Sequence, residues 1–291
     1  MAAKLTGSVL AAALLAAGAL VGCGGGEQEA GRSAARAETV VWAVGDGADG
    51  SAAARALARY VAARRPERFV YLGDVYERGT AAEFAQHYDP VYGRLAGLTD
   101  PTIGNHEYGA RRTGYVPYWR RERGWSRRRA LHRSYVDAAS GWQVIVYSSE
   151  SPPRTEGAWV RRQVARRGGT CRIAVGHRGR YAVADTAHRD NTDQAPIWRA
   201  LAGRTAVNLV GHNHLYGRLA PIDGVHVLVS GAGGHDLRAR GPQQHEVAAI
   251  ETGVATATQL TLRRGALDFR QVDARGKVYD AGTIACTPAP S

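Results

Sequence analysis

The sequence is poor in lysine, in cysteine and in long apolar runs. Lys4 and Lys277 are its only lysines, so its net charge of +12 comes almost wholly from arginine. The apolar run Val9–Leu20 is too short to cross a bilayer as a helix, which excludes a membrane-spanning segment there. The sequence shows no internal repeat and no recognisable nucleic-acid motif, so we expect no specific nucleic-acid partner.

The first residues are typical of an exported lipoprotein. Lys4 precedes the apolar run, which ends in Leu20-Val21-Gly22-Cys23 and resembles a bacterial lipobox. We expect a signal peptide over residues 1–22 and lipidation of Cys23; an ordinary signal peptide with an incidental cysteine is the alternative. Residues 23–38 predict a flexible tether and residues 39–291 a single domain. Acyl chains on Cys23 would hold the exported protein on the cell membrane.

Five apolar segments of strand length each end in glycine followed by aspartate, asparagine or histidine. These junctions are Gly45-Asp46, Gly73-Asp74, Gly104-Asn105-His106-Glu107, Gly176-His177 and Gly211-His212-Asn213-His214. Because open α/β sheets bind ligands beyond the carboxyl ends of their strands, we expect all five on one rim of one sheet. In an extended chain, His212 and His214 would point to the same side. Taken alone, that motif could instead be a surface loop with two solvated histidines.

The side chains at these junctions are two carboxylates, an amide and several imidazoles. Oxygen and nitrogen donors without a thiolate suit hard or borderline cations such as Mn, Fe or Zn. A single Gly-Asp pair would be a weak signal, but five junctions in this order are a strong one. The sequence therefore predicts a metal site at the strand ends.

In their order, the junctions resemble the calcineurin-like metallophosphoesterase superfamily, and within it the purple acid phosphatase-like bacterial phosphoesterases. The resemblance covers Thr39 to Leu237 and includes Tyr71-Leu72-Gly73-Asp74, His177-Arg178-Gly179-Arg180-Tyr181 and Ser230-Gly231-Ala232-Gly233-Gly234. It implies an α/β fold, a four-layer α/β/β/α sandwich with two facing mixed β-sheets and the metal site at the strand ends. The β-α-β pattern of the first two-thirds and the strand-like alternation of the last third agree with it.

The resemblance also implies two metal ions and a role for each junction. The metal ligands would be Asp74 as the bridge, Asp46 and His214 for one ion, and Asn105, His177 and His212 for the other. A water whose pKa the cations lower would attack phosphorus. His106 is the candidate for protonating the leaving alkoxide, or else a histidine that only orients its neighbours. His188 is a candidate for binding the substrate phosphate, or else a plain loop histidine.

The chain departs from the family pattern in two places. Many members have a metal-binding histidine two residues after the first aspartate, where this chain has Ala48. Purple acid phosphatases have a tyrosine three residues after the second aspartate; that position is Glu77 here, and Tyr76 precedes it. Since adjacent residues of an extended chain point opposite ways, we do not expect Tyr76 to be a ligand. The first metal would then have fewer protein ligands, or be held by Glu77 or by water.

Three further expectations concern segments outside the junctions. We interpret the arginine cluster from Arg111 to Arg133 as a solvated basic loop; a phosphate pocket, contact with lipid headgroups and nucleic-acid binding are the alternatives. Cys171 and Cys286 either pair in an oxidising compartment or are free buried thiols. The remaining histidines are expected to be structural or exposed, namely His87, His132, His226, His235 and His245, although Gly233-Gly234 could bring His235 near the rim.

The sequence predicts an exported, lipid-anchored metallophosphoesterase that acts on phosphate monoesters of small organic molecules. A phosphodiesterase or nucleotidase would use the same dimetal attack, so the motifs do not separate these activities. A surface lipoprotein that has lost one metal and only binds its ligand is the third possibility.

Overall fold

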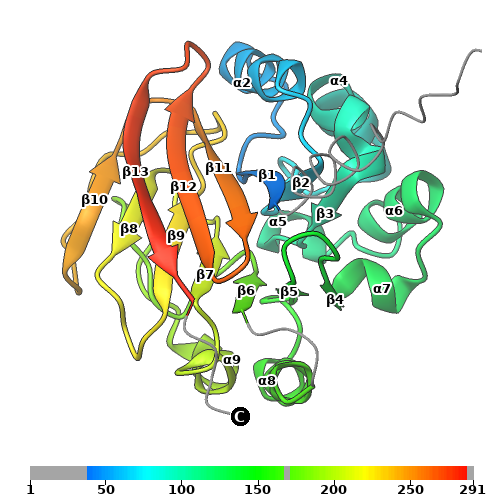
Figure 1. The fold of residues 1–291 in the computed structure, drawn as a ribbon. Coiled ribbons are helices and arrows are strands. Elements are labelled where there is room, and N and C mark those ends of the chain that lie inside the picture. Colours follow the sequence, from blue (N-terminus) through cyan, green and yellow to red (C-terminus); the bar gives the residue numbers. More distant parts are fainter. Residues whose placement is uncertain (1–37, 167–170, 287–291) are drawn as a thin grey trace, which may run out of the picture. The chain divides into compact units, whose positions relative to one another are not determined.

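Two mixed β-sheets organise the computed structural model, which describes residues 38–166 and 171–286 (Figure 1). The six-stranded sheet has the order β13-β12-β11-β1-β2-β3 and contains β1 (Glu38–Val44), β2 (Arg68–Tyr71), β3 (Thr99–Pro101), β11 (Thr256–Arg263), β12 (Ala266–Asp273) and β13 (Val278–Ala285). The seven-stranded sheet has the order β10-β8-β9-β7-β6-β5-β4 and contains β4 (Arg133–Val136), β5 (Trp142–Val146), β6 (Cys171–Val175), β7 (Val207–Val210), β8 (Tyr216–Leu219), β9 (His226–Ser230) and β10 (Val247–Glu251). The predicted signal peptide, Cys23 and the tether up to residue 37 lie outside the described residues, whereas Glu38, the last residue assigned to the tether, begins β1.

Each sheet contains one block of parallel strands. Strands β1, β2 and β3 are parallel in the first sheet, and β5, β6, β7 and β9 are parallel in the second. The last strands, β11 to β13, pair as an antiparallel meander. The sequence therefore predicted the β-α-β pattern of the first two-thirds and the strands of the last third correctly. It did not predict β8 and β13.

The helices lie on the connections between strands. They are α2 (Ala52–Ala63), α3 (Ala81–Glu83), the π-helical turn η1 (Phe84–Tyr88), α4 (Asp89–Tyr92), the 3₁₀ turns η2 (Gly93–Leu98) and η3 (Thr192–Gln194), α5 (Asn105–Tyr108), α6 (Tyr115–Arg123), α7 (Arg127–Leu131), α8 (Pro153–Val164) and α9 (Ala195–Leu201). Ser51 caps helix α2, because its side chain accepts a hydrogen bond from the Ala54 N–H. No helix within these described ranges is long and apolar enough to cross a bilayer.

The arginine cluster is not a loop. Most of it folds into α6 and α7, and its last residue, Arg133, begins β4. One side of α6 is buried and carries Tyr115, Tyr118 and Trp119 at helical spacing. Burial of these aromatic side chains stabilises the helix between Gly114 and Gly124, the glycines at its two ends. The arginines of these helices are therefore held on an ordered surface.

Side-chain alternation along β1 shows how the layers form. Val41 and Ala43 join the core between the two sheets, together with Leu209 and Leu228 from the opposite sheet. Trp42 and Val44 point the other way and pack with residues of α2 and α4. Another core joins the outer face of β5 and β6 to α8 and α9 (Figure 1). The four-layer α/β/β/α sandwich predicted for this chain is thus confirmed.

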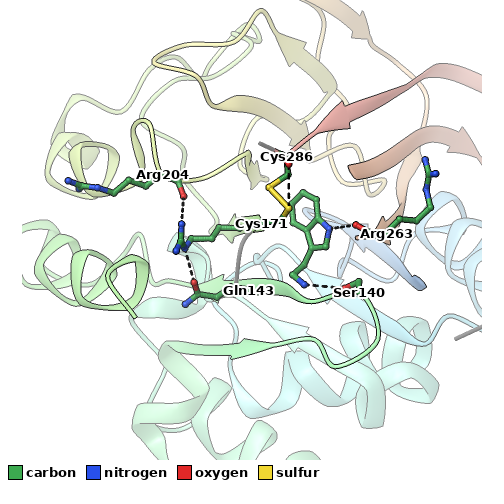
Figure 2. Close-up of a disulfide and its surroundings, with 8 residues drawn as sticks. Ser140, Gln143, Cys171, Arg204, Arg263 and Cys286 are labelled. Atoms are coloured by element: carbon green, nitrogen blue, oxygen red, sulfur yellow. Dashed lines mark hydrogen bonds between the residues drawn. A yellow bond between two sulfur atoms is a disulfide. The ribbon is translucent and has the colours of Figure 1, made fainter. Parts of the chain in front are cut away.

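The two sheets are also joined covalently. Cys171, the first residue of β6, forms a disulfide with Cys286, which directly follows β13; their Cα atoms are 5.5 Å apart (Figure 2). Close by, the Trp142 indole N–H donates to the Arg263 carbonyl across the same pair of sheets, at 2.7 Å. The paired alternative for these cysteines is therefore the correct one. The link lies at the amino-terminal end of β6, whereas Gly176-His177 follows its carboxyl end.

Candidate metal centre

The five glycine junctions meet at one rim, but this rim belongs to both sheets. Asp46, Asp74 and Asn105 follow strands of the six-stranded sheet, while His177 and His212 follow strands of the seven-stranded sheet. The expectation of a single sheet was wrong, because each sheet contributes its own block of parallel strands. The two blocks touch directly: the His212 backbone N–H donates to Asp46 Oδ2 at 2.9 Å.

The junctions are turns rather than extended chain. Asp46, Asp74 and His212 have φ angles of 59°, 67° and 69°, in the left-handed region that aspartate and histidine tolerate better than most residues. His212 and His214 therefore reach the rim by a turn and not by strand alternation. Glycine is required at Gly104, where a Cβ atom would overlap the Asp74 carboxylate. Strained backbone at three neighbouring polar residues is typical of functional sites.

One group of donors has the spacing of a metal site. The ligating atoms of Asp74, His177 and His212 all lie within 4.8 Å of one another. His177 Nε2 is 3.3 Å from Asp74 Oδ1 and 2.9 Å from Asn105 Oδ1. The structure thus brings together the predicted bridge and the three residues predicted for one ion.

Backbone carbonyls orient two of the histidines. His177 donates its Nδ1–H to the Leu72 carbonyl at 2.7 Å, and His214 donates its Nδ1–H to the Asp236 carbonyl at 3.0 Å. The Nε2 atoms therefore point into the rim, where that of His177 contacts Asp74 and Asn105 and that of His214 lies 3.7 Å from Asp46 Oδ1. Such a hydrogen bond on the far nitrogen is how proteins fix the tautomer of metal-binding histidines.

Tyr76 lies inside the rim, contrary to the prediction. Its hydroxyl is 3.2 Å from Asp46 Oδ1, 3.3 Å from Asp74 Oδ2 and 3.2 Å from His214 Nε2. The prediction was wrong because the residues after Asp74 turn instead of continuing a strand, so the alternation of an extended chain does not apply. The Glu77 side chain is 68% exposed and lies outside this group. Tyr76 is therefore better placed than Glu77 to hold a cation with Asp46 and His214.

His235 also belongs to the rim. Its ring stacks on Tyr76 with centroids 3.5 Å apart, and its backbone N–H donates to the Asp46 carbonyl. The sequence grouped His235 with structural or exposed histidines but allowed that Gly233-Gly234 could bring it near the rim. That second possibility is the one observed.

His106 lies beside Asp74 at the rim, and His188 lies beside His212. His106 is the second residue of α5 and does not extend a strand; its Nδ1–H donates to the Glu77 carbonyl at 2.7 Å, and its Nε2 is 3.9 Å from Asp74 Oδ2. The His188 ring centroid is 4.2 Å from that of His212. Asp185 connects this edge to the rim, because its Oδ2 accepts from both His188 Nδ1 and the His214 backbone N–H. Both histidines can therefore reach a ligand held at the rim.

The charge of the site indicates what it can hold. Asp46 and Asp74 are 0% and 1% exposed, and neither has an arginine or lysine partner within the described ranges. Burial raises the pKa of Asp46 well above its ordinary value, His177 opposes this, and Asp74 adds to it. Burial acts in the same direction on Asp74, but His177 outweighs it and keeps the pKa of that carboxyl well below its usual range. Buried carboxylates without a permanent cation fit a metal ion.

The histidines have contrasting protonation tendencies. Burial lowers the pKa of His177, but the Asp74 carboxylate overrides it and raises the pKa to about 10, so without a metal a proton sits between them. Burial, followed by the charge of His177, lowers the pKa of His212, and burial lowers that of His214 to about 4. Neutral imidazoles are the form that binds a metal. The donor set therefore fits the implied cations.

Glu107 holds two of the junctions together. This carboxylate is 0% exposed and accepts backbone N–H groups from Gly104 at 2.8 Å, Asp74 at 3.2 Å and Val75 at 3.1 Å. Burial, followed by the Asp74 carboxylate, raises the pKa of Glu107 to about 8. Glu107 is the last residue of the junction Gly104-Asn105-His106-Glu107, but the sequence alone did not indicate a role for it. The contacts make it a positioning residue for Asp74.

We expect Glu107→Gln to weaken metal binding about 10- to 100-fold. A glutamine can accept the Gly104 and Asp74 N–H groups with its oxygen. Its NH₂ group must then face the Val75 N–H, which loses its hydrogen-bond acceptor. Metal titration of the chelated protein measures the change. Glu156→Gln is the matched control, since Glu156 is equally buried and also accepts a backbone N–H, that of Ser148. Equal metal affinity in the two variants would contradict this role.

Comparison with solved structures agrees with the fold. GAP50, the anchor in the inner membrane complex of Plasmodium, has a TM-score of 0.68 at 14% identity, over 86% of this chain and 90% of that one. A purple acid phosphatase from yellow lupin (Lupinus luteus) seeds also scores 0.68, at 16% identity over 85% of this chain, which spans 54% of the lupin protein. A dimetal phosphatase from Danio rerio scores 0.58 at 12% identity, over 86% of this chain and 99% of that one.

The chain resembles these proteins in fold rather than in sequence. No protein-family model matches the sequence, and no curated protein matches it either. The fold implied by the calcineurin-like resemblance is thereby confirmed from coordinates.

Proposed function

We propose that this chain, which shares its fold with a purple acid phosphatase and a dimetal phosphatase, is a metal-dependent phosphoesterase that hydrolyses phosphate monoesters. One observation carries the proposal: two buried carboxylates and three imidazoles from two sheets converge on a single rim without a permanent cation. Asp74, Asn105, His177 and His212 would hold one metal, and Asp46, Asp74, His214 and Tyr76 the other. Fe, Mn and Zn all suit these donors.

The ligands suit a substrate that carries two negative charges. When bound, the cations would stabilise charge on the phosphoryl oxygens and supply a water of lowered pKa. Asp74 suits the bridging position because its Oδ1 faces His177 while its Oδ2 faces Tyr76. Asn105 contributes an oxygen without adding charge, which limits repulsion of a phosphate dianion.

Two histidines serve the substrate. His106 is 31% exposed, and its bond to the Glu77 carbonyl directs Nε2 toward the Asp74 side of the rim. A protonated His106 would give its Nε2 proton to the leaving alkoxide. His188 is fixed beside His212 by Asp185, and Arg238 Nη1 lies 3.3 Å from its Nε2, so His188 and Arg238 would together meet a phosphate oxygen at this edge of the rim.

Export and a lipid anchor at Cys23 complete the proposal. The lipobox-like sequence supports the anchor, and the Cys171–Cys286 disulfide supports an oxidising compartment. Phosphoesterase activity should then be found in washed membranes of cells that express the whole chain. Activity confined to the soluble fraction would contradict the anchor.

Hydrolysis after chelation tests the function. The purified protein is stripped of metal, reloaded with Mn, Fe or Zn singly, and assayed on a chromogenic phosphate monoester and diester. We expect activity to disappear on chelation, to return with at least one ion, and to be higher on the monoester. Full activity in the stripped protein would contradict a metal-dependent reaction.

The same assay separates the alternatives. A higher rate on the diester favours a phosphodiesterase. Hydrolysis of neither ester by a protein that binds metal favours a non-catalytic surface protein, and GAP50, named as an anchor, shows that the fold occurs in a protein described by that role.

A further inference from the structure

A hollow of about 310 Å³ lies between α7 and α8, beside the edge strand β4. It is formed largely by the arginine cluster that the sequence suggested to be a loop. None of the candidate metal ligands lines it. The hollow is therefore separate from the rim and has no part in the reaction proposed above.

Four arginines line this hollow and no carboxylate does. Arg128 and Arg129 come from α7, Arg133 from β4, and Arg166 follows the end of α8. Arg128, Arg129 and Arg166 are exposed, and none of them has an ion pair within residues 38–166 and 171–286. Guanidinium groups gathered without an acid repel one another, and an anion placed among them would remove that repulsion.

Arg133 is fixed and incompletely paired. It is 7% exposed; its Nε donates to Asp100 Oδ1 at 2.9 Å and its Nη1 to the Pro101 carbonyl at 3.0 Å. Its guanidinium lies 4.5 Å from the Trp125 ring centroid. Its Nη2 is buried and has no hydrogen-bond partner in the described part of the chain. Arg133 therefore forms a rigid part of the wall of the hollow, held by Asp100 and Pro101.

The neighbouring His132 is in a similar position. Its ring stacks on Trp159 with centroids 4.6 Å apart, and its Nδ1 donates to Glu156 Oε2 at 3.2 Å. Its Nε2 is buried and likewise lacks a partner among the described residues. His132 and Arg133, two adjacent residues that line the hollow, are thus both held rigidly by other contacts.

We propose that this hollow binds a phosphate group, at a site distinct from the metal rim. Guanidinium forks match the oxygens of a phosphate in pairs. The three arginines without an ion pair, Arg128, Arg129 and Arg166, would favour a dianion over a singly charged carboxylate. The phosphate belongs either to a small soluble anion or to the headgroup of an anionic phospholipid. The proposal does not depend on the phosphoesterase activity.

Calorimetric titration with inorganic phosphate tests the site. The protein is stripped of metal first, so that the rim contributes little to binding. The double variant Arg128→Gln/Arg129→Gln is expected to bind phosphate at least about tenfold more weakly, since each arginine supplies charge-assisted hydrogen bonds. Arg120→Gln/Arg162→Gln is the matched control: both arginines are exposed on the adjacent α6 and on α8, and neither lines the hollow.

The outcomes decide both the site and the source of the phosphate. An equal loss in the two double variants would overturn the proposal, because it would indicate diffuse surface charge. If the wild-type protein does not bind free phosphate, flotation with phosphatidylcholine vesicles, with and without phosphatidic acid, follows. Binding that requires phosphatidic acid and is lost only in Arg128→Gln/Arg129→Gln supports a headgroup site. Binding to neither probe overturns the proposal.

Discussion

Replacing Asp74 with asparagine is expected to lower turnover of a phosphate monoester by about a thousandfold or more, because ligands of one metal site act as a unit. Asp74 is 1% exposed, and its carboxylate oxygens lie 3.3 Å from His177 Nε2, 3.3 Å from the Tyr76 hydroxyl and 3.9 Å from His106 Nε2. Asparagine has the same size and tolerates the left-handed backbone at this position, but it removes the charge that two cations would share. The measurements are kcat and the metal content of the purified variant.

The fold should survive this substitution. Asp223→Asn is the matched control, since Asp223 also has a positive φ, of 50°, and lies away from the rim, where it accepts from the Trp198 indole N–H. It should retain wild-type turnover, and both variants should show the wild-type circular dichroism spectrum. Turnover of Asp74→Asn close to that of the control would count against the proposed metal centre.

Removing the disulfide is expected to lower the free energy of unfolding by about 3–5 kcal/mol. Cys171 and Cys286 are 115 residues apart in the sequence, so the bond closes a long loop in the unfolded chain. The double variant Cys171→Ala/Cys286→Ala avoids placing a hydroxyl at Cys171, which is 1% exposed. Denaturation by guanidinium chloride, followed by tryptophan fluorescence, gives the difference.

Two controls accompany this measurement. Reducing the wild-type protein should lower its unfolding midpoint to that of the double variant, and the reductant should leave the variant unchanged. Turnover should be close to wild type wherever the variant remains folded, because the disulfide and the rim lie at opposite ends of β6. An unfolding midpoint that the reductant does not alter would contradict the predicted contribution.

The sequence predicted the rim because its signal is local. A strand followed by glycine and a polar residue can be recognised wherever it occurs, and each of the five junctions lies at the end of a strand or directly after its turn. The sharing of the rim between two sheets depends on which strands pair. That pairing is a long-range property that the junctions themselves do not carry.

Side-chain direction was predicted less well where the chain leaves the strands. The exclusion of Tyr76 assumed an extended chain, whereas Asp74 has a left-handed φ and the following residues turn. The role of Glu107 was missed for a related reason, because its partners are backbone N–H groups that a side-chain motif does not display. Both misses concern short turns whose geometry is set by the packing around them.

Elements defined by their neighbours were also missed. Strand β13 lacks clear alternation, and it is a strand because it pairs along β12, with Gly282 close to the Phe269 ring. Helices α6 and α7 were hidden by the arginines, although Tyr115, Tyr118 and Trp119 have the spacing of a buried helical face. In that segment, the spacing of the three aromatic residues predicts the helix, whereas the arginines suggested a loop.

The division of the ligands between two sheets has a mechanical consequence. Asp46 and Asp74 follow strands of one sheet, and His177 and His212 follow strands of the other. An ion bound by both groups would therefore link the two sheets, at the end of β6 opposite the disulfide. A slight slide of one sheet against the other would then separate the ligands. Val70 and Leu209 pack in the core between the two sheets and would resist such a slide, although neither is among the proposed ligands.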